Sequence, residues 1–91
     1  MDFGVALNAL KNGLRVRRDF WAPGMWLIIV PGSQFPIAAD RPLGKAAPHL
    51  IGDIATYRPH FDVCIFHGGE PSLGPWAKPD DDLLAEDWEV M

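Results

Sequence analysis

Cysteine is almost absent from this sequence. Cys64 is the one cysteine among 91 residues, so no internal disulfide can form. That usage is typical of a reducing compartment. No apolar run approaches the roughly 18 residues of a membrane helix, and no secretory signal is visible. We therefore expect a soluble, intracellular protein without a membrane partner.

Positive charge is also scarce. Eight Lys and Arg stand against 12 Asp and Glu, for a formal net charge of −4. This balance argues against DNA or RNA polymers as partners, because their binding depends on phosphate neutralisation. The charge is uneven: residues 70–91 hold one lysine and seven acids, whereas residues 1–69 hold seven basic and five acidic residues. The first part can still hold a small anionic ligand.

Aromatic residues, by contrast, are plentiful. The chain has four Trp, five Phe and one Tyr, and 48% of its residues are hydrophobic. A domain this short buries only about 60–65% of its unfolded surface. Such a load indicates a dense core, or apolar surface used in oligomerisation or ligand stacking. We favour a symmetric homo-oligomer.

The local patterns predict a single α+β domain over residues 1–91, with one N-terminal helix on an antiparallel sheet. Met1–Asn12 has helical spacing, and strands are expected at Leu14–Phe20 and Met25–Val30. These two strands should form a hairpin, and the second is apolar enough for burial on both faces. The remaining segments are predicted to be a turn at Pro31–Phe35, a long irregular stretch at Ile37–Ala55, a turn at His67–Pro75, a helical turn around Leu83–Glu86 and a strand at Asp87–Val90.

The stretch Thr56–Phe66 alternates like a strand, and Pro59 predicts an edge position or a bulge. One face carries Arg58, His60 and Asp62. On a strand, each of these side chains lies about 7 Å from the next one. A cation, an imidazole and a carboxylate in such a row form a polar surface suited to binding a ligand. A solvated sheet face gives the same pattern, so both interpretations stay open.

Metal binding and catalysis have weak support. His60, Asp62, Cys64 and His67 include metal-ligating types, but no paired Cys or His motif accompanies them, and Arg58 disfavours a nearby cation. No nucleophile elbow, phosphate loop or dinucleotide fingerprint is present. We expect no catalytic residue, no metal and no cofactor, and binding without turnover.

A series of short motifs resembles the second Thoeris anti-defence family, small and mostly phage-encoded proteins long known as a domain of unknown function. The match spans nearly all the chain except Ile37–Ala55 and Gly68–Gly74. The quoted motifs are helix Phe3–Lys11 with Gly13, Arg15–Arg18, Trp21, Gly24-Met-Trp, Val30-Pro-Gly-Ser-x-Phe35, Tyr57-Arg-Pro-His-x-Asp62, Pro75-Trp76 and Asp82-Leu-Leu-Ala-Glu-Asp-Trp-Glu89.

The resemblance implies a protein that sequesters a signal molecule. Family members capture glycocyclic ADP-ribose, made by host TIR-domain enzymes, without cleaving it, and some relatives bind cyclic oligonucleotides of the cGAS-like pathway. They form homotetramers with ligand pockets between subunits, which implies action in the cytoplasm of the infected bacterium. The expected ligand-binding residues are Trp21, Trp26, Phe35 and Trp76 as an aromatic wall, Ser33, Arg58 and His60 as phosphate contacts, and Asp62 and Asp82 as acceptors.

The chain departs from the family pattern between Trp76 and Leu83. Relatives often carry Ser-Gln before the acid, where this sequence has Lys78-Pro-Asp-Asp, and the change can alter which cyclic nucleotide is accepted. Two alternatives stay open. One is a nucleotide hydrolase or transferase with His60 as base and Asp62 as orienter; the other is a structural phage protein whose aromatics serve assembly alone.

Overall fold

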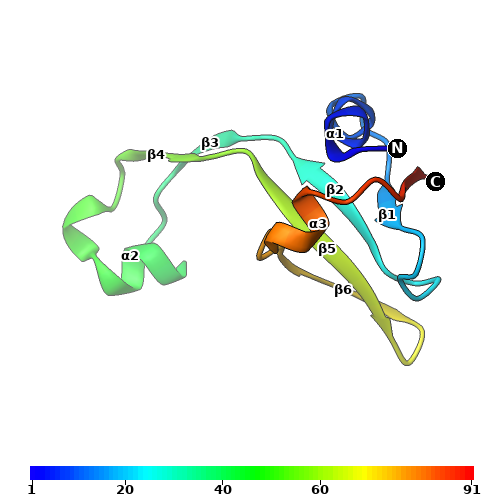
Figure 1. Ribbon diagram of the computed structural model, residues 1–91. Helices are drawn as coiled ribbons and strands as arrows, with labels where there is room; N and C mark the ends of the chain where they lie inside the picture. The colour runs from blue at the N-terminus through cyan, green and yellow to red at the C-terminus, as the bar shows by residue number, and fades with distance from the viewer.

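The computed structural model describes residues 1–91 and has the predicted α+β architecture (Figure 1). Strands β6, β5, β2, β1 and β7 form, in that order, a five-stranded antiparallel sheet, and β3 and β4 pair separately. The elements are α1 (Phe3–Lys11), β1 (Val16–Arg18), β2 (Trp26–Val30), β3 (Ser33–Pro36), α2 (Pro42–Ala46), the 3-10 turn η1 (Pro48–Leu50), β4 (Ile54–Tyr57), β5 (His60–His67), β6 (Glu70–Pro75), α3 (Asp80–Leu83) and β7 (Trp88–Val90).

Helix α1 forms where the sequence predicts it. The backbone N–H of Val5 donates to the Asp2 carboxylate over 2.9 Å, so Asp2 caps the helix. Gly13 follows its end with φ 82°, a conformation that glycine adopts without strain. Ala6 and Leu10 are buried against the sheet. The hairpin of β1 and β2 and the final strand are confirmed as well.

The core lies between α1 and one face of the five-stranded sheet. Trp88 is at its centre and makes edge contacts with Trp21 and Trp76, at ring-centroid distances of 5.4 and 5.9 Å. The buried cluster consists of Ala6, Leu10, Val16, Trp21, Leu27, Trp76 and Trp88. Three of the four tryptophans therefore contribute to packing within the chain.

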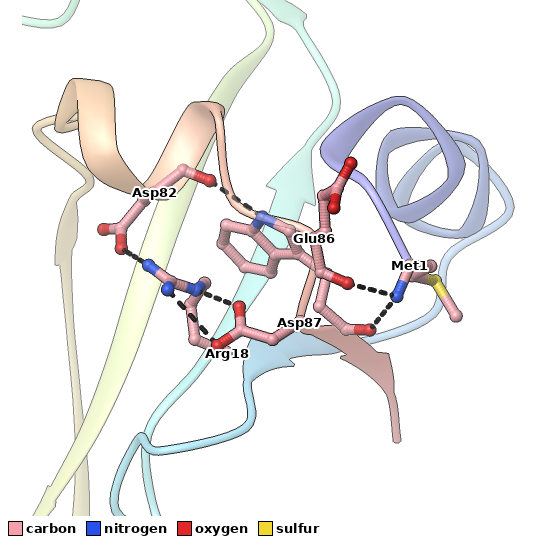
Figure 2. Close-up of polar contacts among 6 residues, drawn as sticks. Met1, Arg18, Asp82, Glu86 and Asp87 are labelled. Atoms are coloured by element: carbon pink, nitrogen blue, oxygen red, sulfur yellow. Dashed lines mark hydrogen bonds and ion pairs between the residues drawn. The ribbon is translucent and has the colours of Figure 1, made fainter.

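The two chain ends are joined by hydrogen bonds (Figure 2). The amino group of Met1 donates to the carbonyl oxygens of Glu86 and Trp88 over 2.9 and 3.1 Å. The backbone N–H of Trp88 donates in return to the Met1 carbonyl over 3.0 Å. The start of the chain is thus fixed to β7 and to the central tryptophan.

A two-stranded arm, residues 31–59, extends from this body and carries α2 and η1 at its tip (Figure 1). Val30 pairs with His60 at the end of the body sheet, and Ser33 pairs with Tyr57 at the start of the arm. Both chain segments are three residues long between these two pairs, so the register of β2 with β5 continues into β3 and β4. Pro31 therefore lies opposite Pro59. Neither proline has an N–H, and the hydrogen-bond ladder is interrupted there.

This geometry corrects the prediction for Thr56–Phe66. The segment is two strands, divided at Arg58 and Pro59, and β5 lies inside the sheet between β2 and β6 rather than at an edge. The inference from Pro59 was wrong because the proline sits in the break between two ladders, where no N–H is required.

Three other segments contain more regular structure than predicted. Pro31–Phe35 was predicted to be a turn, but the chain there is extended and enters β3 at Ser33. Ile37–Ala55 was predicted to be irregular, but it contains α2 and η1. In the segment His67–Pro75, only the residues before Glu70 form the predicted turn, because β6 begins at Glu70. The prolines misled these predictions: Pro42 occupies the first turn of α2, where its missing N–H costs nothing, and those of β6 lie on an edge strand.

The isolated chain is open in shape. Its radius of gyration is 16.4 Å, against about 12 Å for a compact chain of this length. Ten of 91 residues are buried. Strand β2 was predicted to be buried on both faces, but in the single chain Leu27 is its one buried residue. None of the helices has the length and apolar character needed to span a membrane.

Packing at the arm tip predicts a local effect of Gly44→Ala. A Cβ at Gly44 would lie 2.0 Å from the Ala38 carbonyl oxygen, so α2 must move away from Ala38. We expect backbone amides of residues 37–55 to exchange at least about tenfold faster with deuterium, while those of α1 stay protected. Gly74→Ala is the control, because a Cβ there meets nothing within 4 Å. Unchanged exchange at the tip in Gly44→Ala would contradict this packing.

Candidate ligand-binding site

Five of the nine predicted ligand-binding residues lie along the arm and its root. Ser33 and Phe35 are on β3, Arg58 is in the break between β4 and β5, and His60 and Asp62 begin β5. Because β3 pairs with β4 and β4 leads into β5, these residues follow one continuous ribbon. The ribbon is the candidate site.

His60 is held by its surroundings at the root of the arm. Its Nδ1 lies 3.1 Å from the Arg58 carbonyl oxygen, and its Nε2 lies 3.3 Å from an Asp62 carboxylate oxygen. The Tyr57 ring contacts the imidazole edge-on, with centroids 5.0 Å apart. Both ring nitrogens thus face oxygen atoms of the chain, and these contacts fix the orientation of the imidazole.

The arginines fall into paired and unpaired groups. Arg17 pairs with Glu89 at 3.4 Å, and Arg18 pairs with Asp82 and Asp87. Arg58 is exposed at the root of the arm, and no carboxylate pairs with it. An exposed guanidinium without a carboxylate partner is able to bind phosphate oxygens.

The one cavity of the chain lies at the arm tip, between β3 and α2, and has a volume of about 570 Å³. Phe35 forms an aromatic part of its wall, and Arg41 is its one charged lining residue. Arg41 was not among the predicted site residues; the available signal was its position before Pro42, at a helix start. The complete lining is Phe35, Pro36, Ala38, Arg41, Pro42 and Leu43.

The other predicted residues lie away from the ribbon. Trp21 and Trp76 are buried in the core against Trp88. Trp26 lies half-buried on the opposite face of the sheet, with the Arg15 guanidinium 5.1 Å from its ring centre. Their roles in binding stay predictions, and the structure gives Trp21 and Trp76 a packing role.

Asp82, the ninth predicted residue, belongs to an ion cluster around Arg18 (Figure 2). Arg18 Nη1 donates to Asp82 over 2.5 Å, and two guanidinium nitrogens donate to the Asp87 carboxylate. The Asp82 carbonyl oxygen accepts from the Trp88 indole over 2.8 Å. This cluster attaches α3 and β7 to β1.

The cluster shifts three pKa values. Hydrogen bonds from Arg18 lower the pKa of Asp87, and the Asp87 carboxylate in turn raises the pKa of Arg18. A hydrogen bond with Asp87 raises the pKa of the neighbouring Asp19. Arg18 therefore favours the ionised form of one carboxyl, and that carboxylate favours the protonated form of the next.

Comparison with known proteins places the chain in a family. A family model for the Thoeris anti-defense 2-like domain matches residues 1–91. The chain belongs to this family. It is also similar to Thoeris anti-defense 2 of Bacillus phage SP01, with 26% identity over 91 residues that cover 100% of this chain and 94% of the relative. Membership in the Thoeris anti-defense 2-like family implies a phage anti-defence role.

The Arg18 cluster predicts unequal effects of two Arg→Met substitutions. Arg18→Met leaves two carboxylates without their cation, and the Arg18 and Asp82 side chains are each only 14% exposed. We expect a loss of about 1–2 kcal/mol in the free energy of unfolding. Arg17→Met is the control and should cost under about 0.5 kcal/mol, because its partner Glu89 is 48% exposed. Urea denaturation measures both. Equal losses would contradict the cluster's role.

The same cluster predicts a pH dependence. Because the pKa of Asp87 is lower in the folded chain than in the unfolded chain, its contribution is complete above about pH 4. It is lost as the pH falls through the folded value. Asp19 acts in the opposite sense, since its pKa is raised: its contribution is lost as the pH rises through the folded value.

We expect Asp87→Asn to flatten the fall in Tm on acidification below about pH 4, as measured by thermal melts from neutral to acid pH. Glu89→Gln is the control, because this carboxylate makes a longer and more exposed contact with Arg17. An Asp87→Asn melting profile parallel to that of the original chain would contradict the assignment.

Proposed function

We propose that this protein sequesters a cyclic nucleotide immune signal, glycocyclic ADP-ribose or a related cyclic oligonucleotide, in the cytoplasm of the infected bacterium, without cleaving it. The proposal refines the anti-defence role that the family implies. The observation that carries it is the ribbon from β3 through β4 to the start of β5, which holds the Phe35 ring, an exposed guanidinium at Arg58 and the paired His60 and Asp62 side chains.

The chemistry of the ribbon matches such a ligand. The exposed Arg58 guanidinium supplies donors for a pyrophosphate, and His60 holds the Asp62 carboxylate in place. Asp62 retains a second carboxylate oxygen able to accept from a ribose hydroxyl or an adenine amine. Phe35 and the exposed Tyr57 ring offer faces for stacking on a purine.

The same geometry favours binding over hydrolysis. A general base needs a free lone pair directed at its substrate, whereas both nitrogens of His60 face oxygen atoms of the chain. Cys64 is fully buried, which disfavours it as a nucleophile. Sequestration needs neither group; it needs a preorganised site and slow release.

A single chain offers only part of an enclosing site. The ribbon is open along β3 and β4, where most residues are exposed. The accessible surface of the chain is 6240 Å², against about 5,300 Å² for a compact monomer of this mass. The proposal therefore includes a homo-oligomer, a tetramer by the family resemblance, in which another copy supplies the remaining walls.

Isothermal titration calorimetry with glycocyclic ADP-ribose tests the ribbon. We expect Arg58→Gln to weaken binding about 10- to 100-fold, the range that loss of a charge-assisted hydrogen bond gives. Arg17→Gln is the matched control and should bind like the original chain, because its guanidinium already pairs with Glu89. Equal weakening by both variants would show a diffuse charge effect, and no binding by the original chain would overturn this ligand.

A further inference from the structure

Lys78 is the one non-glycine residue of the chain whose backbone lies in the left-handed region, with φ 55°. A residue with a Cβ adopts that conformation only at a cost in free energy, and glycine would avoid the cost. Pro79, which follows, restricts the backbone of Lys78 further. Strained backbone of this kind is concentrated at functional sites. The chain therefore keeps a lysine where its backbone suits glycine.

The segment that contains Lys78 is fixed at both ends, which explains how the strain persists. On one side Trp76 is buried, and its backbone N–H donates to the Phe61 carbonyl oxygen over 3.1 Å. On the other side the Asp82 carboxylate is held by Arg18. The few residues between Trp76 and Asp82 join these two anchors, so the surroundings impose the position of Lys78.

This backbone places a cation beside the start of β5. The Lys78 ammonium lies 5.5 Å from the centre of the Phe61 ring, within the range of a cation–π contact. No carboxylate pairs with it, although residues 80–82 are all aspartates. Lys78 is also exposed, so its ammonium N–H groups are available to a ligand.

We propose that Lys78 binds a phosphate group of the captured ligand. This rests on the proposed function and adds a positioned contact to its site. A pyrophosphate carries two phosphate groups, whereas the ribbon supplies one exposed guanidinium, at Arg58, just before β5. His60 and Asp62 point to the face of β5 opposite Phe61. Lys78 therefore supplies a second cation at the start of β5, from the other face of the strand.

A fixed ammonium favours binding for two reasons. A lysine side chain that is free in solution loses rotamer freedom when it contacts a ligand, whereas Lys78 already rests against Phe61. A preorganised donor costs less to bind. Lys78 is also the one basic residue among residues 70–91, which contain seven acids. Without its charge, this part of the chain would repel a phosphate.

Calorimetric titration with glycocyclic ADP-ribose and with inorganic pyrophosphate tests the contact. We expect Lys78→Gln to weaken binding of both probes about tenfold, as loss of a charge-assisted hydrogen bond does, and Lys78→Arg to retain it. Lys78→Gly should weaken binding to the same extent as Lys78→Gln. It should also unfold at a higher urea concentration than Lys78→Gln, because glycine adopts φ 55° without strain. Lys11→Gln is the matched control and should bind like the original chain, because Lys11 is an exposed lysine at the end of α1.

Each outcome decides the point. Unchanged binding by Lys78→Gln, or equal weakening by Lys11→Gln, overturns the contact, and equal urea midpoints for Lys78→Gly and Lys78→Gln contradict the strain. The two proposals fail separately. Binding of glycocyclic ADP-ribose that Lys78→Gln leaves intact overturns only the role of Lys78. An original chain that binds pyrophosphate through Lys78 but not glycocyclic ADP-ribose overturns only the ligand of the proposed function, and a chain that binds neither probe overturns both.

Discussion

The antiparallel pairing of β2 with β5 is the interaction on which the rest of the structure depends. Its register forms the middle of the body sheet, from Trp26 opposite Cys64 to Val30 opposite His60, and continues into the arm. One face of the pair packs against α1 and Trp88, while its end positions His60 and Asp62. A shift of one residue would exchange the two faces and remove Leu27 from the core.

The facing prolines, Pro31 and Pro59, explain how one pair of chain segments forms both the centre of the body sheet and the arm. Pro31 opposite Pro59 interrupts hydrogen bonding without changing the register, so the arm remains aligned with the body while its backbone is free to bend. Gly32, next to the break, lies so close to the other strand that a Cβ would be 2.8 Å from the Tyr57 carbonyl oxygen. The break thus brings the two chain segments together where His60 receives its contacts from Arg58 and Asp62.

The sequence was sufficient for the elements that depend on local pattern. Helix α1, with Asp2 at its start and Gly13 after its end, and strand β2 were predictable, because capping and hydrophobic period are local properties. The arm was not. No residue of its two strands is buried, and their pairing encloses most of Ile37–Ala55, a segment without clear periodicity. The prolines of the arm fit beside its ladders because they lie where no backbone N–H is needed, and that depends on the pairing of the strands.

The site was only partly predictable for a related reason. The grouping of Arg58, His60 and Asp62 is local, and in the structure His60 contacts the Arg58 backbone carbonyl oxygen and the Asp62 carboxylate. The use of Arg18 is not local: its carboxylate partners Asp82 and Asp87 lie more than 60 residues away. Similarly, nothing in the sequence pattern distinguishes Trp76 in the core from an exposed stacking residue; the long-range packing around Trp88 decides it.

Recovery of the ligand tests the central claim, capture without cleavage, most directly. The purified protein is mixed with an equimolar amount of glycocyclic ADP-ribose, freed of unbound ligand, denatured by heat, and the released molecule is identified by mass spectrometry. The account predicts that the ligand returns in stoichiometric amount with its mass unchanged. Linear products, formed with the original chain but not in its absence, would contradict it and identify an enzyme.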